Sequence, residues 1–323
     1  MSEIQPSQDS SFINNLFLTP DERRLRAGWR LLFQGLLLLF IGGCLSVVLV
    51  GVLLALDPSI LTSLTELEPE FMLLAVAAET VAVTTSVFLA RRFLDKRSIE
   101  SLGLTLNIRA LFDILMGIVI TLVQMGLIYL LMTWLGWITF EGFAWEFDPI
   151  GVVIRNTILF FLIFVFVGWS EELLSRGYHL QTIASGLNLF WGVVISSAIF
   201  GILHLANPNA TWLSAAGIFL AGLLFAYGYL RTVQLWLPIG MHLGWNFFEG
   251  VVFGFPVSGL DIYPLTRIRV QGPELWTGGA FGPEAGLIVL PALILGMALI
   301  YFYTLKRSSP PARDNSPDRH LME

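Results

Sequence analysis

Eight apolar segments divide the chain, and their lengths restrict it to a helical bundle inside a membrane. A helix suits such a segment because it satisfies its backbone hydrogen bonds internally, as a bilayer demands. With 55% hydrophobic and only 13% charged residues, a water-soluble domain could not cover its surface with polar groups. The sequence predicts an all-α, polytopic transmembrane helical bundle of about eight spans, the fourth and fifth short, at residues 30–56, 71–90, 111–135, 153–168, 190–203, 212–230, 235–253 and 285–305.

The same segments set the expected boundaries along the chain. The polar leader is too extended for a cleavable signal peptide, so it should stay attached. The single cysteine, Cys44, rules out a disulfide framework and a cysteine-based metal site. The expected parts are a cytoplasmic leader (1–29), spans one to three (30–149), a core of spans four to seven (150–253), an outer loop (254–284), the last span (285–305) and a disordered cytoplasmic tail (306–323).

Basic residues fall mainly in the connections on one side of this topology. Cytoplasmic loops retain Lys and Arg, which places both termini in the cytoplasm, with Arg155, Arg267 and Arg269 alone on the outer side. The leader shows no organelle-type signal, so a bacterial plasma membrane is expected. A net charge of −6 and the lack of a basic stripe argue against nucleic acid as a partner. The side expected to be cytoplasmic carries Arg23, Arg24, Arg26, Arg91, Arg92, Lys96, Arg97, Arg176, Arg231, Lys306 and Arg307.

Ionisable and amide side chains gather in spans four to seven. Such groups are costly at membrane depth unless they face a bundle interior or a cavity, so their clustering predicts a functional site. The cluster consists of Glu171, Glu172, His204, His242 and Asn246.

Sequence spacing predicts that these side chains meet. Glu171 and His204 are 33 residues apart, and a polar break at residues 185–188 lies midway between them. In an antiparallel hairpin about that break, both would lie roughly 24 Å from the turn. His242 and Asn246 share one helix face, while Gly240 and Gly244 leave another face open to a neighbouring helix.

Three motifs in this region resemble a known family. The segments EELLSR (171–176), FGILH (200–204) and HLGWN (242–246) match the EExxxR, FxxxH and HxxxN motifs of the CPBP family, in the family's order. This family comprises CAAX-processing type II proteases and bacteriocin-immunity (Abi-type) proteins. The resemblance covers about residues 150–250, and weaker similarity extends to 97–104 and 277–286.

The resemblance implies an intramembrane endopeptidase that hydrolyses a peptide bond in a membrane-associated protein or peptide, using a glutamate-activated water. The chemistry agrees, since hydrolysis needs a base, a group that holds the water and donors for the oxyanion. Glu171 with His204 can do the first two tasks, and His242 with Asn246 the third. The expected partners are therefore the lipid bilayer and that substrate.

The two adjacent glutamates should have different roles. Neighbouring helix residues point about 100° apart, so Glu171 and Glu172 cannot both face one site. Arg176 lies four positions after Glu172, which makes Glu172 its partner in a structural ion pair and leaves Glu171 for the water.

Metal dependence is left open by the sequence. Glu171, His204 and His242 form a plausible zinc set of the His₂Glu type, yet no HExxH motif is present. Zinc is therefore a possible cofactor at this stage.

Other residues and other functions complete the expectations. Glu249 is expected in solvent near the outer end of its span, His179 and His320 in water, and Glu79 receives no role. A non-catalytic scaffold or self-immunity protein is an alternative function, as is an ion-coupled transporter. A protease needs a cavity that opens sideways to lipid or to the cytoplasm, whereas a carrier needs access from both sides.

Overall fold

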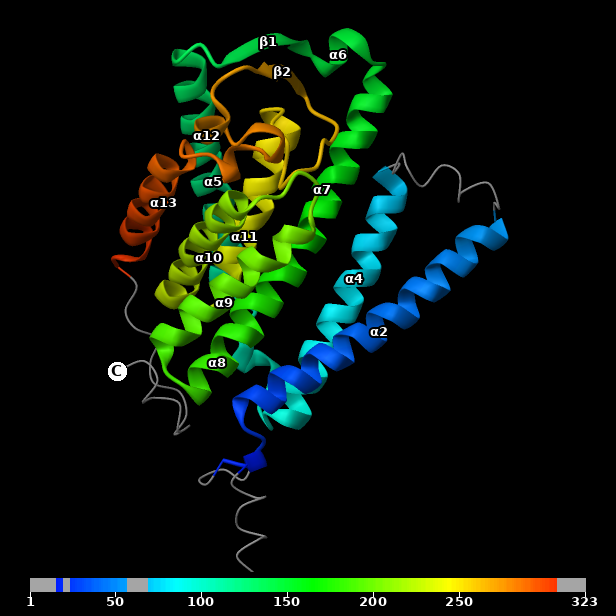
Figure 1. The fold of residues 1–323 in the computed structure, drawn as a ribbon, viewed down its shortest axis with the longest axis vertical. Helices are drawn as coiled ribbons and strands as arrows, with labels where there is room; N and C mark the ends of the chain where they lie inside the picture. Colours follow the sequence, from blue (N-terminus) through cyan, green and yellow to red (C-terminus); the bar gives the residue numbers. More distant parts are fainter. Residues whose placement is uncertain (1–15, 20–23, 57–68, 307–323) are drawn as a thin grey trace, which may run out of the picture.

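Helices form most of the chain that the computed structural model describes, residues 16–19, 24–56 and 69–306 (Figure 1). Most of the predicted leader and the tail after residue 306 lie outside these residues. The main helices are α2 (Ala27–Leu56), α4 (Pro69–Leu89), α5 (Ile108–Trp134), α7 (Ile150–Glu172), α9 (Leu189–Leu203), α10 (Trp212–Thr232), α11 (Trp236–Asn246) and α13 (Val289–Thr304).

The predicted helical membrane bundle is confirmed, but the count of eight spans is not. Within the described residues, six helices are long and apolar enough to cross a membrane. Helix α13 has only 16 residues. Helix α11 has 11 residues, all of them buried, and continues as the π-helix η5 (Phe247–Val252). The seventh predicted span is thus surrounded by protein, which explains why it can carry polar side chains.

The fourth span is longer than predicted. Helix α7 continues without a break through the π-helix η3 (Leu173–Leu180) and α8 (Gln181–Gly186), giving a run of 37 residues. The polar stretch after Gly168 was expected to end the span, but its charged groups are neutralised inside the protein, so the helix continues. Glu171 and Glu172 therefore lie near the middle of the run. The predicted hairpin is confirmed, because α9 begins at Leu189, with Asn188 capping the backbone N–H of Trp191.

Glycines bring the helices around α11 unusually close together. A side chain at Gly240 would overlap the backbone of Ile114 on α5, and one at Gly244 would overlap Thr121 on the same helix. Gly117 on α5 is equally close to α11, because a methyl group at this position would lie 2.5 Å from Leu237 O. The predicted small-residue face of α11 is therefore the one that packs on α5.

Helix α7 approaches α11 in the same manner. A methyl group at Gly168 would lie 3.2 Å from the backbone of both Ile239 and Leu243. Since Gly168 is one turn before Glu172, this close approach carries the two glutamates to the side of His242.

A buried ionic cluster joins α2 to one end of the bundle. Arg30 donates to Asp95 at 2.5 Å and to Ser185 at 2.7 Å, while Arg91 donates to the other oxygen of Asp95 at 3.0 Å. Ser185 lies in α8, so the first helix is fixed to the turn of the α7–α9 hairpin.

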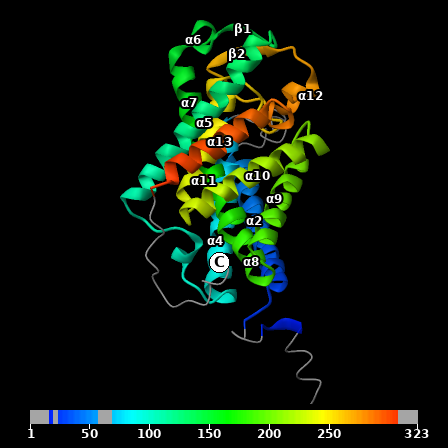
Figure 2. The ribbon, with the colours of Figure 1, turned by 90° about the vertical axis from the view of Figure 1, so that its left-hand side faces the viewer.

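The opposite end carries a two-stranded antiparallel sheet, which departs from the all-α expectation. Strand β1 (Ile138–Phe143) pairs with β2 (Thr266–Val270), with a bulge between Phe140 and Gly142. The strands lie beyond the helices, beside α6 (Ala144–Phe147) and α12 (Glu274–Thr277), as Figures 1 and 2 show. The predicted outer loop is thus an ordered cap.

Replacing Gly240 with Ala tests the close packing of α11 on α5. Alanine is the better helix former by about 1 kcal/mol, so a loss of stability must come from packing. We expect Gly240→Ala to destabilise the fold by about 1–3 kcal/mol, as overpacking does. Thermal unfolding in detergent measures it. Gly35→Ala on α2 is the matched control, because no atom lies within 4 Å of the added methyl group. Equal melting temperatures for the two variants would contradict the packing argument.

Candidate active site

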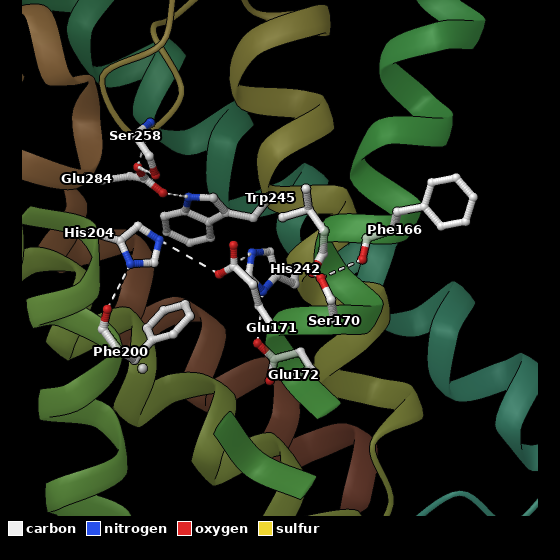
Figure 3. Close-up of polar contacts among 12 residues, drawn as sticks. Phe166, Ser170, Glu171, Glu172, Phe200, His204, His242, Trp245, Ser258 and Glu284 are labelled. Carbon is white, nitrogen blue, oxygen red and sulfur yellow. Dashed lines mark hydrogen bonds and ion pairs between the residues drawn. The ribbon is translucent and has the colours of Figure 1, made fainter. Parts of the chain in front are cut away.

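One cavity of about 180 Å³ brings the predicted site residues together. Glu171, His204, His242 and Asn246 all line it, although they come from α7, the end of α9, and α11. Figure 3 shows Glu171 between the two histidines. The convergence predicted from the hairpin spacing and from the shared face of α11 is confirmed.

The Glu171 carboxylate faces both histidines without touching either. Its Oε2 atom lies 3.8 Å from Nε2 of His204 and 3.7 Å from Nε2 of His242. These separations exceed a direct hydrogen bond and are of the kind that a bridging water spans. In the described part of the chain, Oε2 is buried and accepts no hydrogen bond.

The protonation of His204 follows from its contact with Phe200. Nδ1 of His204 lies 2.8 Å from the carbonyl oxygen of Phe200, one turn earlier. A carbonyl can only accept, so Nδ1 carries the proton and donates. In the neutral ring, Nε2 is then the acceptor that faces Glu171. The phenylalanine of the FxxxH motif also packs edge-on against the His204 ring, at 4.7 Å between centroids.

Glu172 contacts His242, a link that the sequence did not reveal. Oε1 of Glu172 lies 2.7 Å from Arg176 Nη1 and 2.9 Å from His242 Nδ1. Nδ1 donates to the carboxylate, which leaves Nε2 of His242 directed at the cavity. The predicted ion pair with Arg176 is present, and the predicted division between the glutamates matches the geometry, since Glu171 lines the cavity and Glu172 is fully buried behind it.

Arg176 is buried inside the bundle and does not belong among the cytoplasmic loop cations. It is 1% exposed, because η3 is enclosed by neighbouring helices, whereas the sequence analysis placed Arg176 on the cytoplasmic side. Besides Glu172, the guanidinium donates to the carbonyl oxygen of Gly222 at 3.0 Å. It also lies over the ring of Phe200, 4.4 Å from the centroid. Arg176 therefore ties the helix of the glutamates to both α9 and α10.

The outer cap supplies a part of the cavity wall that sequence reasoning missed. Glu284 accepts hydrogen bonds from Trp245 Nε1 at 2.8 Å, from Ser258 N at 3.0 Å and from Ser258 Oγ at 2.6 Å. Burial raises the pKa of the Glu284 carboxyl, and the hydrogen bonds from Ser258 and Trp245 oppose that shift. The weak similarity at 277–286 was the one sequence signal that pointed to this residue.

Two expectations for residues outside the motifs were wrong. Glu249 is fully buried, because η5 lies within the bundle under the cap. His179 is partly buried, because it is part of the continuous α7–α8 run. His320 lies outside the described residues.

The three candidate zinc ligands do not fit a metal ion as the structure places them. Among the described residues, no group of three His, Cys, Asp or Glu side chains is arranged to hold a metal ion.

A second, larger space of about 730 Å³ adjoins the cavity. It runs between α2 and α4 on one side and α7, η3 and α9 on the other. We call it the lateral groove. Four residues line both the cavity and the groove: Glu171, Phe200, His204 and Asn207. The two spaces are therefore adjacent at Glu171. The lining of the groove is mostly aliphatic, and Glu171 and His204 lie where groove and cavity meet.

The buried Glu172–Arg176 pair can be tested by a double-mutant cycle. Removing one partner leaves the other charge buried, so Glu172→Gln and Arg176→Met should each destabilise the fold by about 3–5 kcal/mol. The double variant should lose clearly less than the sum. Thermal unfolding in one detergent gives all four values. The exposed pair Arg269 and Glu141 is the control, for which Arg269→Met should change stability by less than about 1 kcal/mol. Strict additivity at Glu172 and Arg176 would refute the coupling.

Comparison with known proteins supports the resemblance drawn from the motifs. Residues 153–248 match the family described as Type II CAAX prenyl endopeptidase Rce1-like. The chain is 33% identical over 111 residues to a Bacillus subtilis protein named "Putative membrane peptidase YdiL", a match that covers 34% of this chain and 41% of that protein. It is 25% identical over 115 residues to a Methanocorpusculum labreanum protein named "Putative manganese efflux pump MntP", covering 36% of this chain and 61% of that one.

No solved structure matches the chain. The match to the family includes Glu171, Glu172, Arg176, His204, His242 and Asn246. The segment that holds all three motifs is therefore similar to the type II CAAX prenyl endopeptidases of the Rce1-like family.

Proposed function

We propose that this protein is an intramembrane endopeptidase that hydrolyses a peptide bond near one end of a membrane-associated peptide. The observation that carries the proposal is the convergence of Glu171 and two histidines at the junction of the small cavity and the lateral groove. The family match of residues 153–248 supports the same reaction class.

In this mechanism, Glu171 and His204 bind and activate the attacking water. The water donates one hydrogen bond to Glu171 Oε2 and the other to the unprotonated Nε2 of His204. As its oxygen attacks the scissile carbonyl carbon, Glu171 accepts a proton.

His242 and Asn246 would stabilise the oxyanion of the tetrahedral intermediate. The carboxylate of Glu172 stabilises positive charge on His242, so both ring nitrogens can donate, Nδ1 to Glu172 and Nε2 to the oxyanion. The Asn246 amide lines the same cavity. When the C–N bond breaks, the proton on Glu171 passes to the leaving amine. One water is consumed, and a carboxyl group and an amine are formed.

The lateral groove supports a substrate that approaches from within the bilayer. The groove is lined by α2 and α4, two of the six helices that could span a membrane, and it leads to Glu171. A sideways opening is what a protease of membrane-bound peptides needs.

Glutamine at position 171 tests the assignment of the base. Glu171→Gln keeps the side-chain shape but removes the proton acceptor, so cleavage of a membrane-tethered peptide library should fall to background, a loss of at least about a thousandfold. Glu172→Gln should keep measurable activity when it is extracted intact, because Glu172 positions His242 and does not face the water. The assay uses purified protein in lipid nanodiscs and mass spectrometry of the products.

Several outcomes would count against this proposal. Equal and complete loss in two well-folded variants would mean that the glutamates act as a unit. If a chelator abolished the wild-type activity and zinc restored it, the reaction would depend on a metal and the metal-free mechanism would be wrong. Absence of cleavage, together with substrate binding or ion flux in proteoliposomes, would favour the scaffold or the transporter.

We also propose that both termini face the cytoplasm of a bacterial cell. Three arginines lie at the end of the bundle where α2 begins and α13 ends. Arg30 and Arg91 both contact Asp95 there, and Arg231 contacts Thr304 at the end of α13. At the opposite end, the three basic residues Arg155, Arg267 and Arg269 are each paired with a carboxylate, Glu70, Asp148 and Glu141 respectively. On the side of the termini, Arg30 and Arg91 share the single carboxylate of Asp95, and Arg231 contacts a hydroxyl group, so positive charge is in excess among these residues.

Reporter fusions test this orientation. A reporter that works only in the cytoplasm should be active when fused at the C-terminus and inactive when fused within the cap after Trp276. A reporter that works only outside the cell should give the opposite pattern. If the two reporters gave the opposite results, both termini would lie outside the cell and the proposed orientation would be wrong.

A further inference from the structure

Glu79 is a carboxylate at membrane depth for which the motifs offer no role. It lies near the middle of α4 and is exposed to the lateral groove that also contains Glu171 and His204. Ionisable residues in a membrane-spanning segment are costly and serve a function by default.

The packing of α4 on α7 sets the direction in which Glu79 points. Thr80 Oγ1 donates to the carbonyl oxygen of Phe166 at 3.3 Å, and Trp169 Nε1 donates to Thr84 Oγ1 at 2.9 Å. These two threonines are one turn apart, so together they fix the rotation of α4 about its axis. Glu79 is turned about 100° from Thr80, toward the groove.

The wall around Glu79 is built from small side chains. Ala75, Ala78 and Ala82 share its helix face at intervals of three and four residues, and all three line the groove. Across the groove, α2 presents Gly42, Gly43 and Ser46. The carboxylate is thus surrounded by open space and not by packed side chains.

Glu79 has no counter-charge of its own. In the described part of the chain, its carboxylate makes no hydrogen bond and no ion pair, and the residues that line the groove include no lysine or arginine. Glu79 and Glu171 are the two carboxylates of the groove. The groove is therefore negatively charged and apolar, and it selects for a positive charge carried on an apolar body.

We propose that Glu79 is a specificity-determining residue that binds a lysine or arginine side chain of the peptide substrate. The proposal rests on the endopeptidase function proposed above. A basic side chain near the scissile bond would extend its aliphatic stem along the alanine face of α4 and place its charged head against Glu79. The same contact would hold the substrate backbone in register with Glu171.

An inorganic cation fits this place less well than a basic side chain. Calcium and magnesium need about six oxygen ligands. Apart from the two carboxylates, the oxygen-bearing side chains that line the groove are Ser46, Ser175 and Asn207. An ammonium or guanidinium group needs only one carboxylate at its head and apolar surface along its stem.

Peptides that differ at one position test the proposal. The probes are a set of otherwise neutral, lipid-anchored peptides in which a single lysine, norleucine or glutamate is moved along the sequence. The readout is the ratio of kcat/KM for the lysine peptide to that for the norleucine peptide at each position. For the wild type in nanodiscs, we expect this ratio to reach about tenfold at one position, since close charge pairs out of water are worth that much or more.

Variants of Glu79 assign this preference to the groove. Glu79→Gln should bring the ratio at that position close to one, and Glu79→Lys should invert it so that the glutamate peptide is preferred. Glu70→Gln is the matched control, because Glu70 is on the same helix, pairs with Arg155 and does not line the groove. It should leave the wild-type ratio unchanged. A ratio near one at every position in the wild type, or a preference that persists in Glu79→Lys, would overturn the proposal while leaving the protease function standing.

A binding measurement separates the two proposals. Fluorescent lysine and norleucine peptides are titrated into the Glu171→Gln variant and into Glu171→Gln combined with Glu79→Gln. Tighter binding of the lysine peptide that is lost with Glu79 supports the recognition role even if no peptide is cleaved by the wild type. Equal binding of both peptides to Glu171→Gln contradicts it. Circular dichroism and size-exclusion profiles confirm that each variant is folded.

Discussion

The carboxylate of Glu172 is shared by Arg176 on its own helix and by His242 on α11. An unpaired charge on either Glu172 or Arg176 would be unfavourable at this depth, since a buried and unpaired ion costs several kcal/mol. Together they allow a helix of 37 residues to carry glutamates near its middle. Arg176 extends the connection to the backbone of α10 at Gly222 and to the ring of Phe200 on α9. Four elements of the bundle are thus held together by one ion pair.

The same arrangement explains how the side chains of the candidate site acquire their orientation. Glu172 fixes one nitrogen of His242 and the carbonyl of Phe200 fixes one nitrogen of His204, which leaves the remaining nitrogen of each ring facing Glu171. The positions depend on close backbone approach at Gly168, which brings α7 against α11. A π-helix begins directly after Glu172, and such irregular turns are frequent at functional sites because they redirect side chains.

The site opens between two structural parts with different roles. Helices α7, α9, α10 and α11 provide much of the cavity wall, α4 adds Met72 and Val76, and α2 with α4 form one side of the lateral groove. At the end of the bundle that carries the cap, Glu284 binds Trp245 of α11 and Ser258 of the cap, so the cap is fixed to the helix that carries His242 and Asn246.

The sequence by itself determined the helical membrane bundle, the hairpin of α7 and α9, and the five polar residues of the site with Arg176. These follow from local rules, because apolar length, helical period and motif spacing are properties of neighbouring residues. Only the tertiary structure decided that Glu172 contacts His242, that Glu249 is buried, that α7 continues past Gly168, and that Glu284 and Glu79 face the cavity and the groove. Each of these depends on residues far apart in the sequence, whose burial and pairing are fixed by how the helices pack.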